Sequence, residues 1–181
     1  MKIVIDLQGA QACNSNRGIG RYSRQIAKEL CKINSSEIEI HILLNGFFLE
    51  KGILIKKMLM EFLPIENFHI FFPCTSFIES KMDDSQRGQS ILLRDALLEK
   101  INPDFVLITS QFEGFHDNAV VDIEKKISSY KTVIILYDLI PLIYPKIYLH
   151  TKKEKEWYLN QINYLKEVDC ILTISEYTRT T

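Results

Sequence analysis

The chain has 181 residues, a net charge of −1, and hydrophobic residues at 46% of its positions. This length suits one α/β domain with a full core, and the balanced charge excludes the strong basic field expected of a nucleic-acid-binding protein. The four scattered cysteines form no C-x-x-C pair, which fits a reducing cytoplasm, and Cys31 and Cys170 are expected as small core residues. No apolar run approaches the ~20 residues of a membrane span. The chain enters a strand at once, so we expect no signal peptide.

The chain opens with an apolar strand, Ile3–Leu7, followed by a polar loop and then a helix. The helix is indicated by apolar residues three or four positions apart, which are Ile19, Tyr22, Ile26, Leu30 and Ile33. Gly18 and Gly20 lie where this helix should begin. Glycine there lets backbone N–H groups approach a negatively charged ligand closely.

The same loop fits a dinucleotide-binding fingerprint poorly. Ser23 stands where the third glycine should be, and the strand Ile38–Leu44 ends in Asn45 rather than an acidic residue. A nicotinamide cofactor is therefore not expected. A plain surface loop and a ligand site remain equal alternatives for this stretch.

Six apolar runs recur along the chain, mostly with helical material between them. They are Ile3–Leu7, Ile38–Leu44, Phe68–Phe72, Phe105–Ile108, Val133–Tyr137 and Cys170–Ile174. Most are continuous rather than alternating, which is typical of strands covered on both faces. The pattern predicts an α/β fold: a three-layer, Rossmann-like domain over residues 1–181 with a mostly parallel sheet of about six or seven strands.

Three other stretches have predicted structure. Phe47–Leu63 is too apolar for one narrow stripe, so we expect a helix buried on more than one side, the alternative being a surface for a partner or lipid-linked substrate. Pro73–Ser90 reads as turns, and a helix should follow over Ile91–Ile101. A further helix is predicted over Lys152–Val168, with Trp157 facing inward.

Candidate site residues follow the strands, because sites in parallel sheets form beyond the carboxyl ends of strands. Asp138 is the best candidate for chemistry, either as a base or as an acceptor of hydrogen bonds from substrate hydroxyls. The alternative is an aspartate that caps a turn. His116 is the one histidine in a plausible site loop, whereas the strand residues His41 and His69 are expected to be structural. Asp122, with Glu124, is expected on a solvated helix.

Five stretches, taken together and in order, resemble the N-terminal half of glycosyltransferase family 4, retaining enzymes of the two-domain GT-B architecture. They are Asp6 to Gln11, Arg17 to Tyr22, Ser110 to Phe115, Tyr137 to Pro145 and Ile174 to Arg179. The combination is most similar to bacterial mannosyltransferases that build surface polysaccharides. The resemblance implies one half of a GT-B enzyme, with the C-terminal donor-binding domain absent from this chain.

The resemblance also implies roles for individual residues. Asp138 is a catalytic candidate, together with Tyr137, which stands where many members have histidine. The loop facing the donor diphosphate corresponds to Gly18, Ile19, Gly20 and Arg21. The acceptor-binding positions correspond to Gln8, Arg17, Ser110, Glu113, Gly114 and His116.

The implied reaction transfers a hexose, with mannose as the candidate, from a nucleotide sugar such as GDP-mannose to a glycan or lipid-linked acceptor in polysaccharide synthesis. No cofactor or metal is expected, because protein groups in GT-B enzymes stabilise the departing diphosphate. The expected location is cytoplasmic, with peripheral contact at the inner face of the membrane. Self-association is a further expectation, and the chain alone should have little activity. The alternative function is a non-catalytic Rossmann-like binding module.

Overall fold

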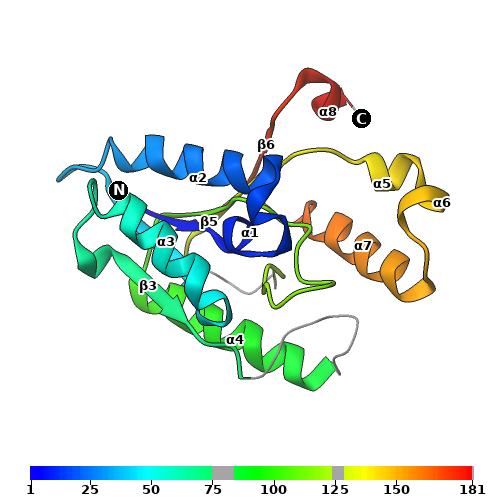
Figure 1. Ribbon diagram of the computed structural model, residues 1–181, viewed down its shortest axis with the longest axis horizontal. Coiled ribbons are helices and arrows are strands. Elements are labelled where there is room, and N and C mark those ends of the chain that lie inside the picture. Colours follow the sequence, from blue (N-terminus) through cyan, green and yellow to red (C-terminus); the bar gives the residue numbers. More distant parts are fainter. Residues whose placement is uncertain (75–83, 124–128, 181) are drawn as a thin grey trace.

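All six predicted strands form a single sheet in a computed structural model that describes residues 1–74, 84–123 and 129–180 (Figure 1). The strands are β1 (Lys2–Asp6), β2 (Glu39–Asn45), β3 (Phe68–Phe71), β4 (Phe105–Ile108), β5 (Lys131–Leu136) and β6 (Cys170–Thr173). Their order is β3-β2-β1-β4-β5-β6, and every neighbouring pair is parallel. The predicted parallel sheet is therefore confirmed.

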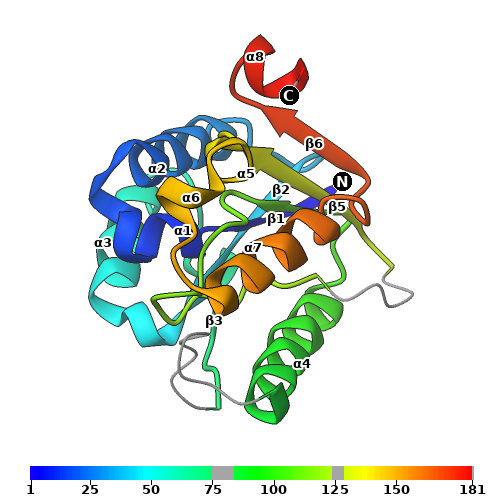
Figure 2. The same ribbon diagram turned by 90° about the vertical axis from the view of Figure 1, so that its right-hand side faces the viewer.

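Helices cover both faces of the sheet, as Figures 1 and 2 show. The α-helices are α1 (Gln8–Gln11), α2 (Gly18–Cys31), α3 (Leu49–Leu59), α4 (Asp84–Ile101), α5 (Ile140–Ile143), α6 (Pro145–Tyr148), α7 (Lys152–Tyr164) and α8 (Glu176–Thr180). Three short 3-10 turns complete the described elements: η1 (Cys13–Asn16), η2 (Gly46–Phe48) and η3 (Ile65–Asn67). Helices α2 and α3 pack on one face and α4 on the other. The predicted three-layer domain is confirmed.

The central strand β1 shows why the apolar runs are continuous. Val4 and Ile5 are both fully buried, but they belong to different core clusters. Ile5 packs with α2 and α3, and Val4 packs with α4. Because successive side chains of a strand point to opposite faces, a strand covered on both sides needs apolar residues at every position.

The helix boundaries follow local signals. Helix α4 ends at Ile101, and the next residue, Asn102, adopts a left-handed backbone with φ of 51° just before Pro103, as the sequence predicts. It begins at Asp84, so residues 84–90 are helical rather than turns, and the rest of the Pro73–Ser90 prediction lies largely outside the described residues. Helix α7 ends at Tyr164, earlier than predicted, and Trp157 does face inward.

Helix α3 differs from its prediction. Ile55 and Leu59 are buried, but Leu49, Ile53, Leu54 and Met60 expose between 50% and 63% of their surface. The expectation of a helix buried on more than one side is wrong, because α3 packs against α1, α2 and β2 through one side and its other side stays exposed. The result is an exposed apolar stripe on an otherwise ordinary surface helix.

Two smaller expectations are also wrong. Cys170 is exposed, because β6 is an edge strand and none of its residues is buried. Asp122 lies in an irregular segment instead of a helix, and only 2% of its surface is exposed. It is paired with Arg87. Hydrophobic and charge patterns alone do not show that a strand lies at the edge of a sheet, or that a carboxylate is buried in an ion pair.

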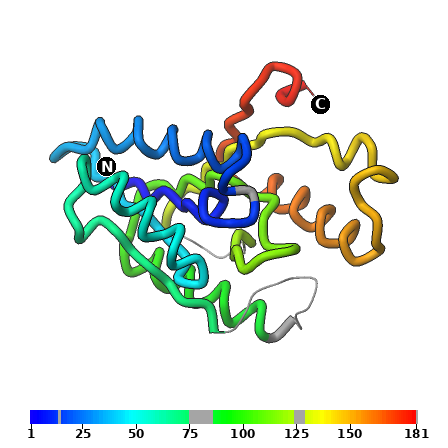
Figure 3. Tube along the Cα trace, in the orientation of Figure 1, coloured from blue at the N-terminus to red at the C-terminus, as the bar shows by residue number. Residues whose placement is uncertain are grey.

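The strand order fixes where a ligand can bind. The chain direction around the sheet reverses between β1 and β4, and in open parallel sheets ligands bind at such a switch point, beyond the carboxyl ends of the strands. The loops after β1 and β4 lie side by side at that edge, between α3 and α7 (Figure 3). Within the described residues, no helix is both long and apolar enough to cross a membrane.

Candidate functional site

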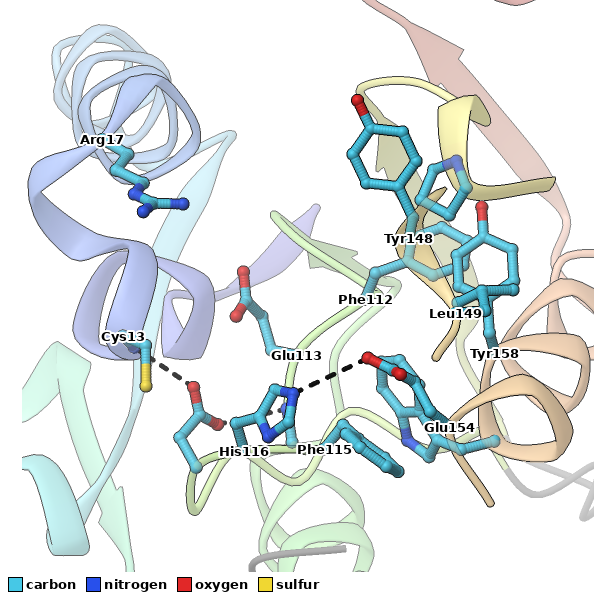
Figure 4. Close-up of a pocket in the computed structure, with 14 residues that line it drawn as sticks. Cys13, Arg17, Phe112, Glu113, Phe115, His116, Tyr148, Leu149, Glu154 and Tyr158 are labelled. Carbon is cyan, nitrogen blue, oxygen red and sulfur yellow. Dashed lines mark hydrogen bonds and ion pairs between the residues drawn. The ribbon is translucent and has the colours of Figure 1, made fainter. Parts of the chain in front are cut away.

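A two-part cleft opens at the carboxyl edge of the sheet, and Figure 4 shows its first part. The first part, here called the aromatic pocket, has a volume of about 580 Å³ and lies between the loop after β4 and helices α6 and α7. The second part, here called the Asp138 pocket, has a volume of about 430 Å³ and lies between the start of α2 and the loop after β5. The two pockets share Arg17, Phe112, Pro141, Tyr148 and Tyr158. They therefore form one continuous cleft.

Five of the six predicted acceptor-binding residues line this cleft. Glu113, Gly114 and His116 belong to the aromatic pocket, and Ser110 belongs to the Asp138 pocket. Arg17 borders both pockets, and Figure 4 shows it across the opening from Tyr148. The sequence therefore predicted most of one wall of the cleft.

The loop after β4 is held rigidly by one carboxylate. Asp117 accepts hydrogen bonds from the backbone N–H groups of Cys13 (3.1 Å), Gly114 (3.1 Å) and Ala119 (3.0 Å). Gly114 has φ of 101°, a conformation that favours glycine. The loop thereby turns Glu113 toward the cleft, where its carboxylate accepts a hydrogen bond of 3.0 Å from Ser110 Oγ.

Gln8, the sixth predicted acceptor residue, lies beneath the cleft instead of in its lining. Its side chain is 1% exposed; its Nε2 donates to Asp6 and to the carbonyl of Val120, and its Oε1 accepts from Val120 N–H and from Asn45. These bonds tie the loop after β1 to the loop after β4. Gln8 thus supports the cleft floor from within.

A buried ion pair anchors the same floor. Arg94 Nε lies 3.1 Å from Asp6 Oδ2, with both side chains at most 3% exposed. Arg94 also donates to the backbone carbonyl of Asp122 at 3.0 Å. The pair joins α4 to the end of β1. Breaking it would leave an uncompensated buried charge, which is strongly destabilising, so the two elements are held together.

The predicted donor-facing loop, Gly18 to Arg21, forms the first turn of α2. No side chain caps this turn, and Ile19 lines the Asp138 pocket. A Cβ at Gly18 would meet nothing within 4 Å, so the backbone there is open to approach. Gly20 is different, because a Cβ there would lie 2.2 Å from the carbonyl oxygen of Ser15. Its lack of a side chain serves internal packing.

The hydroxyl of Tyr137, a predicted catalytic residue, is hydrogen-bonded to other groups of the protein. That hydroxyl lies 3.0 Å from Ser23 Oγ and donates to the Ile19 carbonyl at 3.4 Å. Burial raises the pKa of Tyr137 to about 12, so the phenol stays protonated at neutral pH. These contacts hold Tyr137 beneath the start of α2, where it also lines the Asp138 pocket.

Asp138 lies at the mouth of the Asp138 pocket and is exposed to solvent. Its Oδ1 accepts a hydrogen bond of 3.0 Å from Ile140 N–H, which is the turn-capping role that the sequence left open. The bond uses one carboxylate oxygen and leaves the side chain facing the cleft. Capping and ligand binding are therefore compatible at this residue.

The far wall of the aromatic pocket was not predicted from sequence. It comes from α6 and α7 and includes Tyr148, Leu149, Glu154, Trp157 and Tyr158. Glu154 is oriented by the helix start, where it accepts from His150 N–H, and it lies 3.8 Å from His116 Nε2. The sequence did predict that Trp157 faces inward, and an inward tryptophan indicates a helix face that packs against the protein. Nothing in the sequence showed that this face borders the site.

The lining chemistry of the cleft is mixed. Four carboxylates, of Glu113, Asp117, Asp138 and Glu154, line the cleft together with one arginine, Arg17, and several aromatic rings. Polar groups convergent on an apolar floor are typical of small-molecule sites. Carboxylate oxygens accept hydrogen bonds from sugar hydroxyls, and Arg17 offers the only guanidinium among the described lining residues of the two pockets. In the described parts of the chain, no group of three or more His, Cys, Asp or Glu residues could hold a metal ion.

Comparison with known proteins identifies relatives of this chain. The chain is 31% identical over 178 residues to a serotype-specific mannosyltransferase WbdA of Escherichia coli, an alignment that covers 97% of this chain and 21% of that protein. Two other Escherichia coli proteins with the same description are each 30% identical over 145 residues, covering 79% of this chain and 18% of theirs. The chain is related to a segment of these mannosyltransferases. It spans about a fifth of their length.

This relationship confirms the resemblance to bacterial mannosyltransferases that the five motifs indicate. No family model matches the chain, and no solved structure gives a significant match. The roles of individual cleft residues, the donor, the retaining stereochemistry and the expected independence of metal remain predictions.

Proposed function

We propose that this chain is the acceptor-side domain of a glycosyltransferase that transfers mannose from a nucleotide sugar to a glycan in surface polysaccharide synthesis. The observation that carries the proposal is the cleft at the switch point of the sheet, in a chain related along nearly its whole length to WbdA mannosyltransferases. A nucleotide sugar and a glycan acceptor are its proposed substrates. The nucleotide would be bound mainly by a second domain, as in GT-B enzymes.

The acceptor glycan would lie in the aromatic pocket. Its aromatic floor suits the apolar face of a pyranose ring, and Glu113 and Glu154 can accept hydrogen bonds from hydroxyl groups. In this proposal Asp138 contacts the reacting end of the acceptor, and Arg17 binds the acceptor where the two pockets meet. The open turn at Gly18 faces the donor diphosphate. The transfer step would then occur at the Asp138 pocket.

Ligand-observed NMR on this chain tests the proposal. We expect saturation transfer to methyl α-mannobioside at millimolar concentration and little binding of GDP-mannose alone. Micromolar binding of GDP-mannose, measured by calorimetry, would contradict the division of the two substrates between domains. No binding of any mannoside would favour the alternative, a Rossmann-like module with no glycan substrate.

Contact with a membrane surface is a second part of the proposal. The exposed stripe of α3 carries Leu49, Ile53 and Met60, with Lys56 and Lys57 beside it. Apolar residues flanked by lysines are typical of helices that lie on anionic membranes. This surface supports a peripheral location at the inner face of the cytoplasmic membrane, where a lipid-linked acceptor would be found.

A further inference from the structure

The hydroxyl of Tyr158 is a buried polar group with no hydrogen-bond partner among the described residues. Only 4% of the residue is exposed. Buried hydroxyls in folded proteins nearly always have a partner, since an unsatisfied one destabilises the fold. A buried hydroxyl without a hydrogen-bond partner, beside a ligand-sized cleft, therefore requires an explanation.

The position of the hydroxyl is fixed by packing. The Tyr158 ring stacks on Phe112, with ring centroids 4.8 Å apart and an angle of 27° between planes, and it shares a core cluster with Phe115 and Trp157. Tyr158 lines the aromatic pocket, as Figure 4 shows, and it also lines the Asp138 pocket. Because the oxygen lies on the axis of a clamped ring, rotation of the ring cannot carry it to another partner.

Two polar groups lie near this hydroxyl, the Leu142 N–H and the Asp138 carboxylate, and neither accepts its proton. The backbone N–H of Leu142 already donates to the Leu139 carbonyl at 2.9 Å. Asp138 accepts from Ile140 N–H through its Oδ1, and its carboxylate makes no hydrogen bond to the Tyr158 hydroxyl. Burial raises the pKa of Tyr158, and the negative charge of Asp138 raises that pKa further. The phenol therefore keeps its proton and offers a hydrogen-bond donor at neutral pH.

We infer that Tyr158 and Asp138 together bind one hydroxyl group of the acceptor sugar. The phenol O–H donates to the sugar oxygen, and the Asp138 carboxylate accepts the sugar hydroxyl proton. A hydroxyl both accepts and donates, so it satisfies both residues at once. An ether or a deoxy position cannot do this. Tyr158 is thereby an acceptor-binding residue that selects for a free hydroxyl at one ring position, an inference that rests on the proposed function.

The first test is thermal unfolding of Tyr158→Phe in the free protein. Removing an unpartnered buried hydroxyl should raise Tm by ~2–4 °C, the shift expected from about 1 kcal/mol in a domain of this size. Tyr144→Phe is the matched control, because Tyr144 is 55% exposed and its Tm should not change. A lower Tm for Tyr158→Phe would show that the hydroxyl has a structural partner, and would overturn the inference.

The second test measures binding of methyl α-mannobioside and its monodeoxy derivatives. Tyr158→Phe should weaken binding of the parent sugar about tenfold, and one monodeoxy derivative should show the same loss with the wild-type chain. That derivative should bind Tyr158→Phe and wild type equally. Equal binding of the parent sugar to both proteins would overturn the inference and leave the proposed function standing. Failure of every mannoside to bind wild type would overturn both.

Discussion

Gly20 lies directly against the backbone of Ser15, so that a Cβ at position 20 would meet the Ser15 carbonyl oxygen at 2.2 Å. This contact closes the loop after β1 onto the first turn of α2. It differs from the simpler interpretation of the sequence, in which both glycines serve ligand approach. The two glycines can be separated by experiment, because Gly18 has no neighbour within 4 Å of its Cβ position.

We predict that Gly20→Ala destabilises the fold by about 1–3 kcal/mol, as overpacking against a rigid backbone does. Gly18→Ala should change the free energy of unfolding by less than about 1 kcal/mol, in the stabilising direction, because alanine favours helix. Urea unfolding followed by circular dichroism measures both. Equal effects of the two substitutions would show that the Gly20–Ser15 contact does not matter for stability.

The substitution Asp138→Asn should distinguish the role of Asp138 in capping the turn at Ile140 from its role in ligand binding. Asparagine keeps an oxygen that can accept from Ile140 N–H, so Tm should stay within about 1 °C of the parent, while the carboxylate charge is lost. In a full-length enzyme carrying this domain, we expect mannose transfer to fall at least about 100-fold, the effect typical of losing a general base. Transfer at the parent rate by a folded Asp138→Asn protein would exclude a catalytic role for this carboxylate.

His69 should make the protein less stable in mild acid. Burial, with the nearby His41 and the lysines Lys2 and Lys100, lowers the pKa of His69 from 6.5 to about 4. Between those two values the unfolded chain binds the proton and the folded chain does not, so stability is full above pH 6.5 and is lost as pH falls toward 4.

Substitution of His69 by glutamine should flatten this dependence of the unfolding free energy between pH 6.5 and 4. Some slope will remain, because the pKa of His41, whose Nδ1 lies 3.0 Å from His69 Nε2, is also lowered, chiefly by burial. His116→Gln is the control, since the His116 side chain is 71% exposed. An unchanged slope in the His69 variant would contradict the assignment.

Ile53→Ser on α3 should reduce binding to vesicles of mixed phosphatidylcholine and phosphatidylglycerol, measured by cosedimentation. The apolar stripe loses a side chain that is 56% exposed, so the fold should be unaffected. Leu92→Ser on α4, where the residue is 51% exposed on the opposite side of the sheet, is the matched control. Binding should also weaken with added salt, because the flanking lysines act electrostatically. Equal binding of both variants would exclude α3 as the membrane-contacting surface.

The sequence by itself determined the layers of this protein. Continuous apolar runs such as the one containing Val4 and Ile5 define strands buried on both faces, and helical spacing along α2 defines the covering layer. It also identified one wall of the cleft, because residues that follow parallel strands must meet at one sheet edge. Glu113 and Asp138 were found in this way.

Only the tertiary structure decided which polar residues reach the cleft. Gln8 and Glu113 both follow strands, but Gln8 is turned inward by hydrogen bonds from a loop more than a hundred residues away along the chain, at Val120. The wall formed by α7 depends on packing between Phe112 and Tyr158, another contact between distant segments. Local patterns report which residues prefer burial, whereas side-chain direction at a site is set by such long-range contacts, which no short stretch of sequence contains.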